Sequence, residues 1–120
     1  MSKDPAIQKR YAATIGGWIS RRLWKIKQHG VRHGYTPDID RAYLKTLLVD
    51  KCPVFGYDLI YGGTGMSRPP NLAALDRIDN NIGYMKGNLH IISDHANSMK
   101  RNATYDELLR FAKWAQEMFE

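Results

Sequence analysis

The stretch ALDRIDNNIGYMKGNLHIISDHANSMKRN, residues 74–102, decides the fold because each of its parts has a clear local preference. Two apolar runs, at residues 72–78 and 89–92, predict short strands, and the Asn and Gly residues between them predict a turn. Ser93 is a residue type that caps helices, so a short helix is expected from there through Lys100. The stretch therefore predicts two strands followed by a helix.

Upstream of this stretch, apolar residues recur at steps of three and four and predict a long amphipathic helix. Asp4 and Pro5 are suited to its N-cap and first position. Residues 16–17 are both glycine and predict a kink or a break, while Gly30 and Gly34 predict the end of the helix. The apolar stripe of this helix consists of Ile7, Tyr11, Ile15, Ile19, Leu23 and Ile26.

The remaining elements are predicted from local signals of the same kind. Residues 36–37 are Thr-Pro and predict the start of a second helix, whose apolar face is Ile39, Tyr43, Leu44, Leu47 and Leu48. Residues 52–63 are typical of a turn and a short strand, and residues 62–71 of a loop. Residues 104–107 form a capping box, which predicts a last helix with Leu108, Phe111, Ala112, Ala115 and Phe119 facing inward.

The charge of the chain is concentrated at its N-terminal end. Eighteen Lys and Arg residues against 12 Asp and Glu give a net charge of +6, with eight bases and one acid in residues 1–36. Such an excess favours a phosphate-bearing partner, with Arg21, Arg22 and Lys25 as the expected contacts. A solvated helix with a basic bias is the alternative, and binding to a membrane surface is the less favoured one.

Length and composition exclude several classes of protein. A chain of 120 residues has room for a single core, and one cysteine, Cys52, excludes an internal disulfide framework and a Cys₄ zinc site. No run reaches the roughly 18 apolar residues of a membrane span, and the N-terminal residues do not have the pattern of a secretory signal. A soluble, intracellular domain is expected.

Four polar residues in the quoted stretch stand at a specific spacing. Asp76 lies near the end of the first strand and Asn88 opens the second. Asn97 follows nine residues later on the helix, and Lys100 three residues after that. Together with the segments CPV-G, LDRID, GY--GN and AN--K, this pattern resembles the HNH nucleases of the His-Me finger group, in particular small phage HNH endonucleases. The resemblance covers roughly residues 50–102 and implies a ββα-metal core.

The resemblance also implies roles for these residues. Asp76 and Asn97 would bind one divalent metal ion, and Lys100 would contact a phosphate. Asn88 would hold the loop between strand and helix by hydrogen bonding. One carboxylate and one amide oxygen suit Mg²⁺ or Mn²⁺, because these ions prefer oxygen ligands.

Two departures from the family pattern affect these expectations. The positions of the zinc-binding cysteines found in many HNH proteins are Cys52 with Phe55 and Ser93 with Ala96, so no structural zinc is expected. Arg77 takes the place of the catalytic histidine, and arginine cannot act as a general base near neutral pH.

Three interpretations of Arg77 remain open. It can stabilise the phosphate as a clamp while metal-bound water handles the proton, or it can do so while His95 or His90 takes that role. The third interpretation is an inactive site on a fold kept for DNA binding. Activity is favoured by the joint presence of all four pattern residues, which are Asp76, Asn88, Asn97 and Lys100.

Each of these residues taken alone also has a structural explanation. Asp76 can accept turn hydrogen bonds, Asn97 can be a surface helix residue, and His90 and His95 can be exposed or hydrogen-bonded. The remaining candidates are expected to pack against other side chains, and they are Trp18, Trp24, Trp114 and Cys52.

The sequence thus predicts a single α+β domain in three parts. A helical DNA-binding region spans residues 1–50, an HNH-like core residues 51–102, and a closing helix residues 103–120. The expected function is metal-dependent cleavage or nicking of double-stranded DNA, by a monomer in the cytoplasm of a cell or of a phage host. The alternative is a catalytically inactive DNA-binding protein with the same fold.

Overall fold

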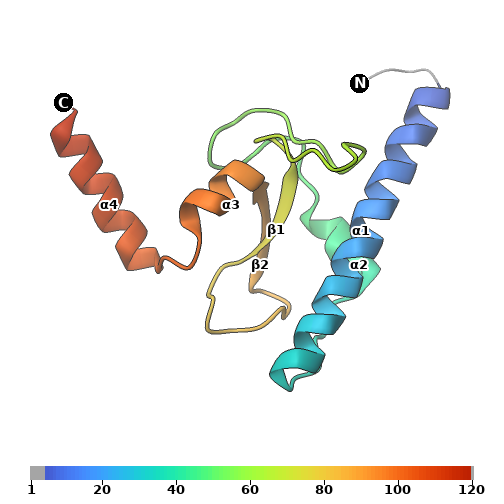
Figure 1. Cartoon of the computed structure of the whole chain (residues 1–120), viewed down its shortest axis with the longest axis horizontal. Helices are drawn as coiled ribbons and strands as arrows, with labels where there is room; N and C mark the ends of the chain where they lie inside the picture. Colours follow the sequence, from blue (N-terminus) through green and yellow to red (C-terminus); the bar gives the residue numbers. More distant parts are fainter. Residues whose placement is uncertain (1–4, 120) are drawn as a thin grey trace.

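The structure of the chain is a computed structural model that describes the backbone of residues 5–119 and the side chains of residues 14–119. The fold is α+β, with a small sheet between helices (Figure 1). Helices α1 and α4 project at opposite sides of the molecule, and α3 lies next to the sheet. The elements in chain order are α1 (Pro5–His33), α2 (Arg41–Leu47), β1 (Ala73–Arg77), β2 (Leu89–Ser93), α3 (Asp94–Lys100) and α4 (Tyr105–Met118).

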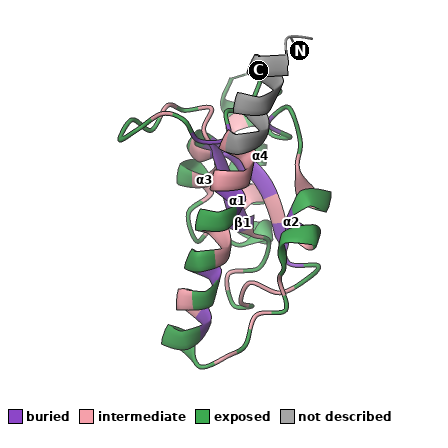
Figure 2. Cartoon of the chain, turned by 90° about the vertical axis from the view of Figure 1, so that its right-hand side faces the viewer, coloured by how far each residue is buried: buried purple, intermediate pink, exposed green. Residues whose placement is uncertain are grey.

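The sheet has two antiparallel strands, β1 and β2, whose register runs from Ala73 opposite Ser93 to Arg77 opposite Leu89. Two strands alone are only marginally stable in water, so the sheet depends on the helices and loops packed around it. Figure 2 shows the buried residues gathered where α1 meets the strands. The core includes Trp18, Ile19, Ile26, Leu44, Cys52, Leu59, Tyr61, Leu75, Leu89, Ile91 and Ile92.

Helix α1 runs without interruption for 29 residues, so the break expected at residues 16–17 is wrong. Trp18 and Ile19 follow directly and are both buried, so the helix is held by its packing at this point. The helix ends before Gly34, which has a φ of 75°, as expected. Gly30 lies inside the helix instead, where a Cβ would stand 2.6 Å from the Pro37 ring. Neither α1 nor another helix in the described part of the chain is long and apolar enough to cross a membrane.

Helix α2 begins later than its sequence signal suggested. Asp40 is the N-cap and accepts a hydrogen bond from the Tyr43 amide at 2.8 Å, so the start expected at residues 36–37 is too early. The strand expected within residues 52–63 is also wrong. That segment has isolated bridges from Lys51 to Asp58 and from Ile60 to Leu72, but no strand of its own.

The strand–strand–helix order predicted for residues 72–100 is confirmed, to within a residue at each strand end. Ser93 is both the last residue of β2 and the N-cap of α3, and its hydroxyl accepts from the Ala96 amide at 3.1 Å. The capping box that begins α4 is confirmed as well, through reciprocal bonds between Thr104 and Glu107.

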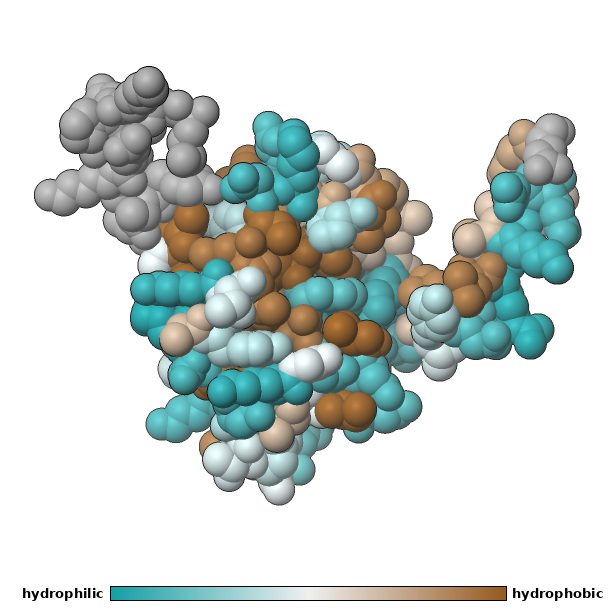
Figure 3. Space-filling model, turned by 180° about the vertical axis from the view of Figure 1, so that it is seen from behind, coloured by the Kyte–Doolittle hydropathy of each residue, from teal (hydrophilic) through white to brown (hydrophobic). Residues whose placement is uncertain are grey.

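Helix α4 does not close the domain, contrary to its expected role. None of its residues is buried, and Phe111 and Trp114 are 67% and 52% exposed. In Figure 3 it is the arm at the right, with hydrophobic and hydrophilic side chains both facing solvent. Trp24 is also exposed, so the packing expected of the tryptophans is found for Trp18 alone. The amphipathic pattern indicated an apolar face correctly but could not indicate whether the chain supplies a partner for it.

Candidate nucleic-acid interface and active site

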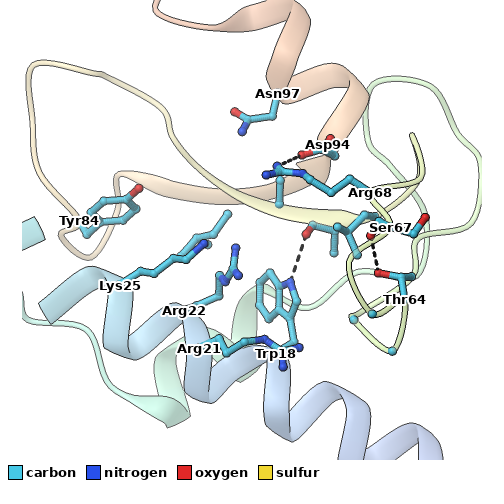
Figure 4. Close-up of a pocket in the computed structure, with 17 residues that line it drawn as sticks. Trp18, Arg21, Arg22, Lys25, Thr64, Ser67, Arg68, Tyr84, Asp94 and Asn97 are labelled. Carbon is cyan, nitrogen blue, oxygen red and sulfur yellow. Dashed lines mark hydrogen bonds and ion pairs between the residues drawn. The ribbon is translucent and has the colours of Figure 1, made fainter. Parts of the chain in front are cut away.

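A pocket of about 600 Å³ lies along β1, between α1 and α3 (Figure 4). Residues 73–75 of β1 form its floor, and the loop around residues 62–68 forms one end. Its cationic lining residues, which define the basic pocket, are Arg21, Arg22, Lys25 and Arg68. The first three are the predicted DNA contacts, and the structure places all of them in one cavity.

Local packing explains why these side chains share the pocket. The Trp18 indole donates to the Ala73 carbonyl at 3.1 Å, which fixes α1 against β1. The next turn of α1 then carries Arg21 and Arg22 over the strand. Gly62 allows the loop to approach them, because a Cβ there would stand 2.8 Å from the Arg21 guanidinium and its φ is 79°.

The basic pocket concentrates positive charge with little compensation. Burial and the neighbouring Arg21 lower the pKa of Arg22, and Arg22, ahead of burial, lowers the pKa of Lys25. Among the described lining residues the one acid is Asp94, and Arg68 pairs with it at 2.5 Å. The Arg22 Nε is buried without a hydrogen-bond partner in the described structure. An anion in the basic pocket would relieve the repulsion among these cations.

A second polar cluster surrounds Asp76, at the end of β1. Asp76 lies directly opposite His90 in the sheet, and its Oδ2 accepts from His90 Nε2 at 2.6 Å and from Lys100 Nζ at 2.9 Å. Lys100 also donates to the Arg77 carbonyl at 2.8 Å. Asp76 is only 6% exposed, so its carboxylate is buried within this cluster.

The charge state of this cluster follows from its contacts. Burial alone would raise the pKa of Asp76, but the hydrogen bonds from His90 and Lys100 outweigh burial and hold that pKa below its ordinary value. Asp76 is therefore an anion at neutral pH, and His90 must donate through Nε2. Nδ1 is then the nitrogen of His90 that remains to accept a proton.

Asn88 is buried and ties down the loop between β1 and β2. Its amide nitrogen donates to the carbonyls of Asp79, Ile82 and Gly83, and its oxygen accepts from the Asp79 amide at 2.8 Å. The sequence analysis expected Asn88 to hold the loop between strand and helix. It holds the loop between the two strands instead.

Arg77 does not lie beside the Asp76 carboxylate. The register is regular through Arg77, so adjacent side chains of β1 point to opposite faces of the sheet. Its guanidinium donates to the carbonyls of Asn80 and Ile82 and lies 5.4 Å from the centre of the Tyr84 ring. Arg77 therefore points away from the Asp76 carboxylate and supports the loop between β1 and β2.

The other predicted site residues are distributed unequally. Asn97 lines the basic pocket, and Lys100, three residues further along α3, reaches Asp76 instead of an open phosphate site. His95 is exposed, and its ring lies 5.3 Å from Phe55. Of the two candidate histidines, His90 is the one in contact with Asp76.

The described residues fit the divalent ion implied by the resemblance in type. Asp76 and Asn97 supply a carboxylate and an amide oxygen, which are ligands that Mg²⁺ and Mn²⁺ accept. The Lys100 ammonium already binds Oδ2 of Asp76, so it competes with any ion for that oxygen. The affinity of Asp76 for a divalent ion therefore depends on how tightly Lys100 holds this oxygen.

The positions that correspond to zinc-binding cysteines form a packed, hydrogen-bonded group. The Cys52 thiol lies 3.3 Å from the Ser93 hydroxyl, which also accepts from Tyr57 at 2.8 Å. Cys52, Ser93 and Ala96 are buried, whereas Phe55 is exposed and contacts the ring of Tyr57. The structure thus brings three of the four positions together in the interior.

Arg68 is the functional candidate that the sequence reasoning missed. It lies in a loop of Gly, Ser and Pro residues, 43 positions after Lys25, and no periodicity connects the two. The tertiary fold alone places its charge in the basic pocket.

The sequence is similar to a phage protein over most of its length. An uncharacterised 29.0 kDa protein in the dda-modA intergenic region of Enterobacteria phage T4 is 31% identical over 94 residues. The match covers 76% of this chain and 35% of the relative, so the chain spans about a third of that protein's length. No protein-family model matches the sequence, and no solved structure matches it.

Proposed function

We propose that the chain is an HNH-type DNA endonuclease that holds the DNA backbone in the basic pocket and hydrolyses a phosphodiester bond beside it. The observation that carries the proposal is a junction on α3. Asn97 lines the basic pocket, and Lys100 on the same helix contacts Asp76. Helix α3 therefore connects the basic pocket, whose cations suit a phosphate, with the Asp76 cluster, whose groups suit hydrolysis.

The binding half of the proposal rests on charge. Three cationic side chains from α1 and Arg68 from the loop before β1 converge on one pocket, where burial and mutual repulsion lower the pKa of Arg22. Contacts between such groups and DNA phosphates release counterions, which supplies most of the affinity of sequence-independent binding. The net charge of +6 adds long-range attraction to the same partner.

The chemical half rests on the Asp76 cluster. His90 Nδ1 accepts a proton from the attacking water while Asp76 holds the opposite ring nitrogen in its protonated form. The arginines of the basic pocket stabilise negative charge on the phosphate. A divalent ion held by Asp76 and Asn97 would, when bound, neutralise charge on the scissile phosphate and the leaving oxygen.

A catalytically inactive DNA-binding protein is the second candidate, and two contacts favour it. Arg77 stands where the family has its catalytic histidine and is bonded to loop carbonyls, and Lys100 takes up the carboxylate oxygen of Asp76. If Lys100 keeps the ion away from Asp76, the fold would bind DNA without cutting it.

The proposal also includes the cellular setting and the oligomeric state. A monomer with one site would nick one strand at a time, and the phage origin of the relative supports action in the cytoplasm of an infected cell. Sedimentation with and without DNA measures the oligomeric state.

Incubation with supercoiled plasmid tests the function. Nicking in Mg²⁺ or Mn²⁺ that stops with EDTA, and that is slowed strongly in His90→Ala, supports the endonuclease. Binding without cutting in either metal selects the inactive candidate, and absence of binding overturns both. The variant Arg21→Ala/Arg22→Ala/Lys25→Ala should bind weakly, whereas Lys27→Ala/Lys45→Ala/Lys113→Ala, with the same loss of charge outside the basic pocket, should bind far more strongly.

A further inference from the structure

A second cavity, of about 380 Å³, adjoins the basic pocket, and the two share Lys25 and Tyr84. Its lining residues, which define the Trp24 cavity, are Trp24, Lys25, Gln28, His29, Arg32 and Tyr84. Five of the six come from the last three turns of α1. The residues assigned above to DNA binding and hydrolysis leave this cavity without a role.

Trp24 is the unusual member of this cavity. It is 63% exposed, while Trp18 on the same helix is 2% exposed and packs into the core. Trp24, Gln28 and Arg32 stand four residues apart, so they form one stripe along the surface of α1. An indole, an amide and a guanidinium therefore follow one another along the wall of the cavity.

The opposite wall is held firmly by aromatic contacts. The Tyr84 amide donates to the Tyr35 hydroxyl at 2.9 Å, and the Tyr84 ring meets the His29 ring edge-on at 5.0 Å. Tyr35 also bonds His29 Nδ1 at 2.8 Å. Arg77 lies over the Tyr84 ring, so the loop that carries Tyr84 is fixed from both sides.

These groups match the chemistry of a nucleobase. Aromatic side chains bind bases by stacking, an amide reads donor and acceptor groups on a base edge, and flanking cations hold the adjacent phosphates. A base within a duplex has both faces covered by its neighbours, so it can stack on an indole only when it is unpaired or extruded.

We infer that the Trp24 cavity binds an unpaired nucleobase of the strand whose backbone lies in the basic pocket. The inference rests on the proposed function and narrows its substrate class. The preferred substrate is a nucleic acid with a single-stranded or extruded nucleotide next to the bond that is cut, and uninterrupted duplex binds less tightly.

The test compares a twenty-nucleotide thymidine oligomer, its uridine RNA counterpart and a twenty-base-pair duplex at equal salt. Trp24→Ala should weaken binding of a single-stranded oligomer roughly 5- to 150-fold, the range given by the loss of one stacked base. Trp24→Phe should recover most of that loss. Duplex affinity should change less than about 2-fold, and Trp114→Ala, an exposed tryptophan on α4, should leave all three affinities unchanged.

Two results would overturn the inference. One is an equal loss of single-strand and duplex affinity in Trp24→Ala. That result would mean that Trp24 contacts the nucleic-acid backbone and not an unpaired base. The other is unchanged single-strand affinity in that variant. A Trp24-dependent affinity for either single strand supports the inference, and the tighter of the two shows whether the thymidine DNA or the uridine RNA is preferred.

The outcome for the proposed function is read separately. If Trp24→Ala binds like the native protein while Arg21→Ala/Arg22→Ala/Lys25→Ala fails to bind, the inference is wrong and DNA binding by the basic pocket stands. If native protein binds neither single strands nor duplex, both are wrong. Because Trp24 is exposed, its replacement should leave the melting temperature nearly unchanged, which separates binding from folding.

Discussion

Asp76 has a structural role that its position in a catalytic pattern conceals. Its carboxylate joins β1 to β2 through His90 and to α3 through Lys100. Lys100 is 13% exposed, so its ammonium depends on Asp76 for compensation of its charge. A group that makes these contacts stabilises the fold whether or not it takes part in chemistry.

Replacement of Asp76 should therefore destabilise the domain. Asp76→Ala leaves Lys100 without its counter-ion, which typically costs about 3–5 kcal/mol for a buried pair. Urea denaturation of native protein, Asp76→Ala and Asp76→Ala/Lys100→Met measures the effect. The double variant should be more stable than Asp76→Ala, and equal stability of the two would show that the pair is not coupled.

The same carboxylate should make stability depend on pH. The pKa of Asp76 is lower in the folded protein than in the unfolded chain, where an aspartate has a pKa of about 3.9. The stabilisation is thus complete above about pH 4 and is lost as the pH falls through the folded pKa. The difference in unfolding free energy between native protein and Asp76→Asn should shrink on acidification from pH 6 to pH 2. A constant difference would contradict the assignment.

Lys100 should control the affinity for a divalent ion. Lys100→Met removes the cation that competes for Oδ2 of Asp76, so Mn²⁺ should bind more tightly than to native protein. Asn97→Ala removes an oxygen ligand and should weaken binding several-fold. Titration calorimetry measures both, and unchanged affinity in Asn97→Ala together with weaker binding in Lys100→Met would exclude this metal site.

The elements differ in how far sequence alone could predict them. β1, β2, α3 and α4 depend on signals within a few residues, such as Ser93 and the Thr104 capping box, and were predicted closely. The docking of α4 depends on whether another surface is available, which an amphipathic pattern does not contain. Within the candidate site, the cations of α1 share one helix and were predictable, but Arg68 and the Asp76–His90 contact depend on tertiary structure and strand register.

Exposed residues of α4 should contribute little to the stability of the domain. Phe111→Ser and Trp114→Ser should each change the free energy of unfolding by less than about 0.5 kcal/mol, because both side chains face solvent. Ile19→Ala on α1 is the buried comparison and should cost about 2–5 kcal/mol. A loss of similar size in Trp114→Ser would mean that α4 is covered in solution.

The whole molecule has a strongly asymmetric charge. All of the net charge of +6 is accounted for by residues 1–36, and α1 carries part of it into the basic pocket. Lys3, Lys9 and Arg10 belong to the same segment, but their side chains lie outside the described residues. We therefore expect basic residues throughout residues 1–36 to contribute to the dependence of DNA binding on ionic strength.

The salt dependence of binding should reveal how many of these charges meet phosphates. Each lost phosphate contact lowers the slope of log affinity against log salt by about 0.9, so Arg21→Ala/Arg22→Ala/Lys25→Ala should lower it by up to roughly 2.7. Fluorescence anisotropy between 50 and 300 mM salt measures the slope. The same slope in native protein and in this variant would place the DNA elsewhere on the surface.

Ser93 gives the core a particular sensitivity to changes in chain length. It is the last residue of β2 and also the cap of α3, so no linker separates strand from helix. One inserted residue at this junction would rotate α3 by about 100° and carry Lys100 away from Asp76. The turn at residues 101–104 separates α3 from α4, so no residue there belongs to one element while capping the next. Insertions and deletions in evolution should therefore be absent at the junction and accumulate after Lys100.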